Sequence, residues 1–275
     1  MDNAITLSFD TSPLGQVAFF KRRLVEIPQF DPPTLRDDVR LTAQRAWLDR
    51  ARSEYVGVMI ARKFWGLLID VNAPLDIQEL ALKMVLDEQR HAHLCIMAAR
   101  SLGAAPEVVF DLWELQQPRT QAPIHEQVME MVIQTYAIGE VTALALIKHA
   151  LSTLPDSGYR TVLKEIAGDE VLHARIGPAL LTAIRQGETT AWLPWPGDAQ
   201  VSIWANTYLR AMAERDVVED DERQLFEDRT AREQLMAVGI PPSDAFKTAY
   251  DQALRTDVLT HFDGLVDLTD GGVIL

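Results

Sequence analysis

The amino-acid sequence predicts an all-α protein: a four-helix bundle with a long crossover connection and additional C-terminal helices. Four long segments repeat apolar residues at alternating steps of three and four, the period of a helix with one buried face. Each segment is much longer than the ordinary helix of about 11–12 residues, and long helices separated by short breaks are typical of bundles. Helical patterning also continues beyond the fourth segment.

The first half of the predicted bundle is a helical hairpin. Residues 1–37 contain PQFDPP and little periodicity, so we expect an irregular lead-in there. Helical patterning then runs from about 38 to 70 and stops before the sequence VNAP. The second helix is expected at about 75–102, because Pro74 stands before it and Gly103 follows its end.

The second half is another pair of helices, reached through a longer connection at residues 104–122 that would serve as the crossover. The third helix is expected at about 123–153, and the fourth at about 159–186, before Gly187. Further helices are expected at about 200–217, 221–237 and 242–257. They either cap the bundle or form a homodimer contact. The expected organisation is a lead-in (1–37), a bundle (38–187) and a helical extension packing on it (188–275).

Composition narrows the class of protein. The chain has 275 residues, 48% of them hydrophobic and 24% charged, which is ordinary for a globular protein. A net charge of −14 argues against binding to nucleic acid or to an anionic membrane surface. The single cysteine, Cys95, excludes an internal disulfide framework. Neither a signal peptide nor an apolar run of the roughly 18–20 residues that span a bilayer is apparent. We expect a soluble cytoplasmic protein.

A glutamate interrupts the apolar seam of every long helix near its middle, and on two of the four helices a histidine follows it three residues later. Burying these carboxylates without compensation would cost several kcal/mol each, so a positive charge must lie among them. Four carboxylates and two neutral imidazoles form a ligand set for two metal ions, with Glu-x-x-His on two of the four helices. The candidate ligands are Glu54, Glu88, His91, Glu140, Glu170 and His173.

On these motifs, residues 45–185 resemble the ferritin-like di-iron carboxylate superfamily. DEQRH at 87–91 is similar to the Asp-Glu-x-Arg-His motif of bacterial di-iron hydroxylases, and the spacing also fits arylamine N-oxygenases, rubrerythrins and aldehyde-deformylating oxygenases. Two departures stand out. Ile166 occupies the position of a third histidine in the N-oxygenases, and Cys95 occupies the position of the radical tyrosine in ribonucleotide reductases.

The resemblance implies a ferritin-like bundle in which the six candidate ligands hold two iron ions and carry the catalysis. Manganese or a mixed iron–manganese pair also suits such a site. By the same resemblance, Asp87 and Asp169 would accept the N–H of the ligand imidazoles. The alternative is that each aspartate is a surface acid in a helical Asp-Glu pair and has no contact with an imidazole.

A pocket is expected where small or apolar residues flank the ligands by one turn. Ordinary helix packing also favours small residues, and Tyr136 is equally well explained as part of the core. The expected lining residues are Ala51, Val58, Met84, Cys95, Ile133, Tyr136, Ala143 and Gly177.

The function expected from the resemblance is a non-haem di-iron monooxygenase. It would use O2 to hydroxylate, N-oxygenate or desaturate a small organic substrate, with electrons from an external reductase or ferredoxin. One alternative is a peroxidase or ferroxidase of the rubrerythrin or ferritin type. Another is a non-catalytic interaction module stabilised by metal, which the C-terminal helices suggest.

Overall fold

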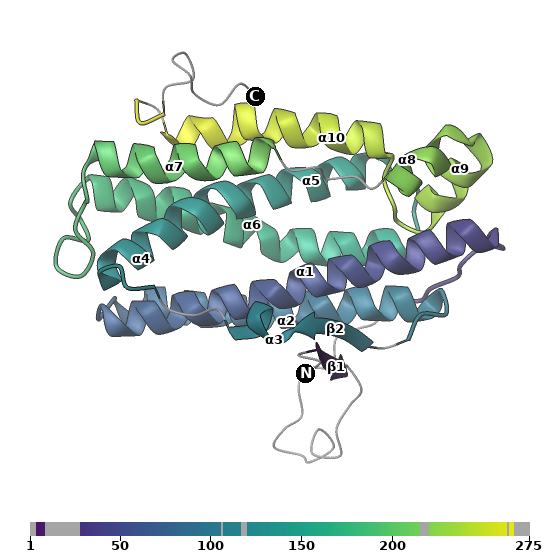
Figure 1. The fold of residues 1–275 in the computed structure, drawn as a ribbon, viewed down its shortest axis with the longest axis horizontal. Helices are drawn as coiled ribbons and strands as arrows, with labels where there is room; N and C mark the ends of the chain where they lie inside the picture. The colour runs from purple at the N-terminus through teal and green to yellow at the C-terminus, as the bar shows by residue number, and fades with distance from the viewer. Residues whose placement is uncertain are drawn as a thin grey trace.

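The computed structural model describes residues 4–8, 28–105, 107–116, 120–214, 220–262 and 264–266. These residues are predominantly helical, which confirms the all-α class. Two layers of long helices lie lengthwise against each other, and shorter helices cover the upper layer and one end (Figure 1).

The lower layer is the helical hairpin of α1 (Asp37–Asp70) and α2 (Leu75–Ser101), which pack along each other. Their bounds agree with the expected ranges to within one residue. The turn between them places Asn72 at φ 54°, a left-handed conformation that asparagine tolerates better than most residues.

The upper layer holds a continuous helical rod beside α6 (Gly158–Arg185). The rod consists of α4 (Ile124–Met131), the π-helical segment η3 (Val132–Gly139) and α5 (Glu140–Thr153). We expected one regular helix over this range. The π-helical turns shift the helical register, and such segments occur often at functional sites.

The C-terminal helices pack on this upper layer. α7 (Asp198–Ala213) contacts η3, and α10 (Ser243–Gln252) continues through η4 (Ala253–Val258) along α5. The helix expected at 221–237 is broken at Asp228, whose side chain accepts hydrogen bonds from the backbone N–H groups of Thr230 and Ala231. The bounds of the remaining elements are α8 (Asp220–Glu227), α9 (Arg229–Ala237) and η5 (Leu259–Phe262).

A small antiparallel sheet corrects two expectations. β1 (Ala4–Ser8) lies within the region predicted to be irregular, and it pairs with β2 (Glu107–Asp111) in the connection after α2. The short helix α3 (Leu112–Gln116) follows. Each strand has only five residues and its partner lies far away in the sequence, so local patterning gave a weak signal. The rest of the lead-in up to residue 27 lies outside the described residues.

The apolar core is divided into two clusters along the helices. On α1, one cluster includes Ala51 and the other begins at Ala61; on α6, one includes Ile166 and the other begins at Ala174. On α1, α2 and α6, the acidic and imidazole residues selected from the sequence lie between the two clusters. Apolar packing on both sides therefore fixes the position of the polar cluster.

One described helical stretch, Ile124–Thr153, is long and apolar enough to cross a membrane by length and composition alone. No run of this length was expected from the sequence. Within the 18-residue window that passes the test, 44% is buried inside the protein, and core helices of soluble proteins pass the same test.

We predict that Gly177→Ala destabilises the protein whereas Gly168→Ala stabilises it, although both glycines lie on α6. A Cβ at position 177 would overlap the backbone of Tyr136 and Ala137 in η3, while nothing lies within 4 Å of a Cβ at position 168. Overpacking of this kind costs about 1–3 kcal/mol, and alanine gains about 1 kcal/mol over glycine in an open helix position. Urea unfolding of both variants measures the difference; equal stabilities would contradict the close contact.

Candidate metal centre

The six residues predicted to be metal ligands converge at the middle of the long helices. Glu54 comes from α1 and Glu140 is the first residue of α5. The i, i+3 spacing of Glu88 and His91 on α2, and of Glu170 and His173 on α6, places each pair on one helix face. Both histidines are fully buried, and both glutamates of these pairs are about 5% exposed or less.

The six residues form two groups that share one carboxylate. Glu88, Glu140, Glu170 and His173 make the first group, and Glu54, His91 and Glu170 make the second. Within each group the candidate ligand atoms lie within 4.8 Å of one another. A buried Glu/His cluster of this kind could hold metal ions, because carboxylate oxygen and imidazole nitrogen both bind iron, manganese and zinc.

The Nδ1 atoms of both imidazoles face carboxylate oxygens from two directions. His91 Nδ1 lies 3.4 Å from Glu54 Oε2 and 3.4 Å from Glu170 Oε1. His173 Nδ1 lies 3.2 Å from Glu88 Oε1 and 3.4 Å from Glu170 Oε2. Neither Nδ1 has a hydrogen-bond partner of good geometry among the described residues. Buried polar atoms without such a partner, converging from opposite helices, fit a pair of metal ions.

The opposite nitrogen of each imidazole contacts an aspartate of the other helix. His91 Nε2 lies 3.1 Å from Asp169 Oδ2 on α6, and His173 Nε2 lies 3.3 Å from Asp87 Oδ2 on α2. An Nε2–H that donates to the aspartate leaves Nδ1 as a lone-pair donor. The two aspartates thus have the imidazole contacts that the resemblance implies, and they make them crosswise between α2 and α6.

Two basic residues support these aspartates from the outer side. Lys83 pairs with Asp87, and Arg90 pairs with Asp169 as well as with Glu165 at 3.4 Å. Burial opposes ionisation of Asp87 and Asp169, but the hydrogen bonds from the imidazoles and from these cations hold the pKa of both carboxyls below its ordinary value. Both aspartates are therefore ionised acceptors at neutral pH.

The pKa values of the inner carboxyls diverge because they share a small buried volume. Burial, together with the charges of Glu54 and Glu170, raises the pKa of Glu88 to about 7. Burial and the same kind of repulsion raise the pKa of Glu140 well above its ordinary value. Burial acts on Glu170 too, but hydrogen bonds to His173 and His91 lower its pKa to about 2. The cluster requires positive charge among its carboxylates, which protons or metal ions can supply.

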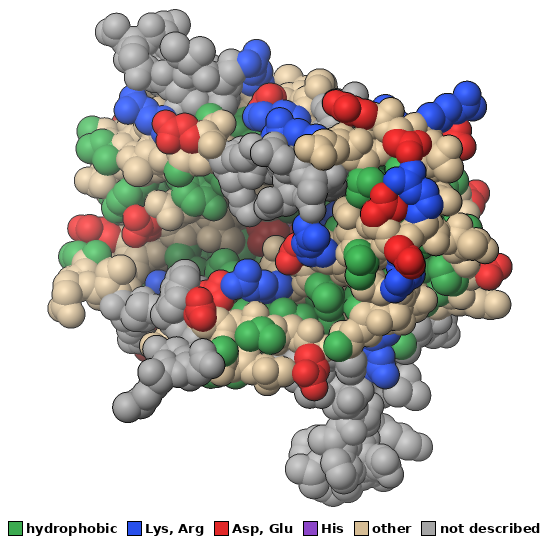
Figure 2. All heavy atoms as spheres, turned by 45° about the vertical axis from the view of Figure 1, so that its right-hand side comes forward, with side chains coloured by type: hydrophobic (Ala, Val, Ile, Leu, Met, Phe, Trp, Pro, Cys, Tyr) green, Lys and Arg blue, Asp and Glu red, His purple; other side chains and the backbone are tan. Residues whose placement is uncertain are grey.

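A cavity of about 500 Å³ opens onto this cluster between α1 and α5. Glu54, Glu88, Glu140 and Glu170 all line it. In the view of Figure 2 the surface is hollowed between the two layers, and acidic side chains are visible at the back of the hollow. The volume lies within the range of about 300–1,000 Å³ typical of small-molecule sites.

The cavity shares one residue with the expected pocket lining. Of the eight residues selected from the sequence, Ala143 lines this cavity. The expected residues were chosen on the helix faces that pack against neighbouring helices. The cavity is lined mainly by the next face of α1, which includes Arg50, Ser53 and Gly57. The residues that do not line it are buried in the core or packed against η3: Ala51, Val58, Met84, Cys95, Ile133, Tyr136 and Gly177.

Tyr136, one of the expected lining residues, is buried in the core. Its ring packs on Phe64 with 4.4 Å between centroids, and its hydroxyl has no hydrogen-bond partner among the described residues. Burial, together with the charges of Glu140 and Glu88, raises the pKa of the phenol well above its ordinary value. Tyr136 is therefore a neutral core residue close to the carboxylates.

Gly57 is a site residue that the sequence analysis missed. It lines the cavity one turn after Glu54, and a Cβ at this position would overlap the carboxylate of Glu88 on α2. An isolated glycine inside a long helix lowers helix stability, and so it signals a close approach of another group. That signal was present in the sequence at YVGVM.

No protein-family model matches this sequence, and no curated protein matches it. The helical architecture and the buried Glu/His cluster are compatible with a di-iron carboxylate site.

We predict that Asp87→Ala weakens metal binding about 10- to 100-fold, because loss of an imidazole's hydrogen-bond acceptor frees its orientation and tautomer. Chelator-competition titration with Zn²⁺ measures the affinity. Asp156→Ala is the matched control, since Asp156 is 97% exposed in the turn before α6. An unchanged affinity in Asp87→Ala would show that the contact with His173 plays no part in binding.

We predict that Gly57→Ala lowers metal affinity by about 10-fold or more, because the added methyl group displaces the Glu88 carboxylate from its position. The carboxylate is the end of a flexible side chain, so the free energy of unfolding should change much less than in Gly177→Ala. Gly66→Ala on the same helix is the control, since nothing lies within 4 Å of its Cβ. Full metal affinity in Gly57→Ala would place Glu88 outside the ligand set.

Proposed function

We propose that this protein is a non-haem di-iron oxygenase with a ferritin-like four-helix bundle, acting on a small organic substrate. The observation that carries the proposal is a pair of Glu/His groups that share Glu170 and open onto a cavity of about 500 Å³. Two iron ions held by these groups would bind O2 and pass electrons to it.

The protein's own residues have distinct roles in this proposal. His91 and His173 would each present Nδ1 to one metal ion, and Glu170 would contact both ions because it belongs to both groups. Asp87 and Asp169 would accept the Nε2–H of the imidazoles and so leave Nδ1 free for a metal ion. Glu54, Glu88 and Glu140 would complete the ligand set on the side that faces the cavity.

The cavity favours the oxygenase over a ferroxidase or a peroxidase. Oxidation of ferrous ions or removal of peroxide needs only a passage for small species. Apolar side chains such as Leu146, Ile147 and Phe246 line the cavity beside the carboxylates, as binding of an organic molecule requires. Electrons would come from a separate reductase or ferredoxin, and manganese is an alternative metal.

We predict that the chain binds about two iron ions, and that the anaerobically loaded, reduced protein consumes O2. Glu170→Ala should lose most of both properties, because Glu170 belongs to both groups. Elemental analysis gives the metal content, and an oxygen electrode gives the rate. Glu79→Ala, an exposed position on α2, should behave like the unchanged protein.

Two outcomes would contradict the proposal. Normal iron loading in Glu170→Ala would overturn the assignment of the metal centre. Full loading without consumption of O2 would retain the metal centre but remove the oxygenase, leaving a metal-stabilised module.

A further inference from the structure

We propose that Arg50 is the anchor for the carboxylate group of the substrate, so that the cavity accepts small organic acids. The inference rests on the proposed function and deepens it, because it names the class of molecule that the cavity binds. It comes from the distribution of charge along the cavity wall.

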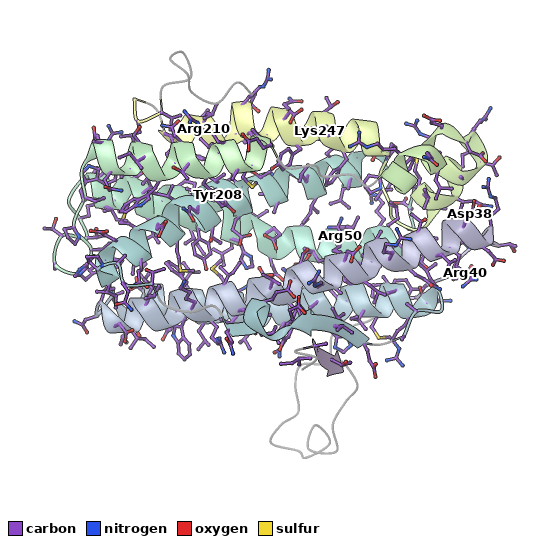
Figure 3. The ribbon with its side chains drawn as sticks, viewed as in Figure 1. Asp38, Arg40, Arg50, Tyr208, Arg210 and Lys247 are labelled. Carbon is purple, nitrogen blue, oxygen red and sulfur yellow. The ribbon has the colours of Figure 1, made fainter. Side chains whose placement is uncertain are left out.

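Arg50 is the only lysine or arginine among the described residues that line the cavity. It lies on α1 four residues before Glu54, on the side of the helix that faces α5 (Figure 3). The other charged groups of the wall are acidic: Asp49 at the exposed rim and the four glutamates of the metal centre. Arg50 is thus the single positive charge in a cavity wall whose other charged groups are carboxylates.

The guanidinium of Arg50 is available to a ligand. It makes no ion pair with another described residue, and its contact in the structure is with the face of the Trp47 ring, 5.8 Å from the centroid. The surface arginines of the same helix end differ, since Arg36 and Arg40 pair with neighbouring aspartates. An arginine that is half-buried in a cavity wall without a carboxylate partner can accept one from a ligand.

A single guanidinium suits a monoanion. Its planar pair of N–H groups matches the two oxygens of a carboxylate, and Ser53 lies in the same wall as a further hydroxyl donor. A phosphate dianion would meet one cation and the repulsion of Asp49. With two divalent ions bound, the four glutamates no longer carry excess negative charge, so an organic monoanion is not repelled from the floor.

Position along α1 also indicates the shape of the ligand. Arg50 and Glu54 are four residues apart, about 6 Å along the helix axis. With its carboxylate at Arg50, a ligand would direct its remaining atoms along the apolar wall of Ala143 and Leu146 toward the metal centre. The atom that reacts would then be several bonds away from the carboxylate.

The test compares acids with their neutral amides on the full chain loaded with Zn²⁺, which binds without redox chemistry. Calorimetry would measure the affinities of phenylacetate against phenylacetamide and of octanoate against octanamide. We expect each acid to bind about 10-fold or more tightly than its amide, as a charge-assisted hydrogen bond provides. Arg50→Gln should abolish this preference and Arg50→Lys should keep part of it. Arg62→Gln, an exposed position on α1, should leave the preference unchanged.

Zinc analysis of the same samples separates the two ways of failing. Full zinc loading with equal binding of acid and amide, or with the preference intact in Arg50→Gln, overturns the role of Arg50 and leaves the metal centre in place. Failure to load zinc overturns the metal centre, and the assignment that rests on it falls as well.

Discussion

The structure depends on four carboxylates, two of them buried and two partly buried, that lie beside two buried imidazoles in the middle of a helical core. The carboxylates lie close together and are largely enclosed by protein, so each one raises the energetic cost of ionising the next. Protons meet part of the need for positive charge, as the raised pKa of Glu88 shows. Divalent cations meet it with more charge in the same volume. The proposed chemistry follows from this electrostatic requirement more than from any single residue.

The surrounding elements hold these carboxylates and imidazoles together in different ways. Two apolar clusters pack the long helices together, and within each of the two groups the ligand atoms lie within 4.8 Å of one another. Gly177 brings α6 against η3, and Gly57 leaves room for the Glu88 carboxylate. Close backbone packing and an open cavity thus coexist within a few residues of the same centre.

The sequence predicted the long helices well because proline and glycine breaks delimit them, and it selected the six polar residues because they interrupt apolar seams. Their role as metal ligands stays a prediction. It missed the π-helical segment, because a π-helical turn leaves the chain helical and apolar and so gives no break in the sequence pattern. It missed the sheet because β1 and β2 pair over a long sequence separation. It did not select Arg50 and Gly57, which line the cavity, because only one seam per helix was considered.

The crosswise contacts between aspartate and histidine have a mechanical consequence. One runs from α2 to α6 through His91 and Asp169, and the other runs back from α6 to α2 through His173 and Asp87. Rotation of either helix about its own axis would lengthen both contacts at once. The orientation of each imidazole therefore depends on how the opposite helix is rotated about its axis. The helices fix the direction of both nitrogen donors before any ion arrives, and geometric selectivity among metals becomes a property of how α2 and α6 pack.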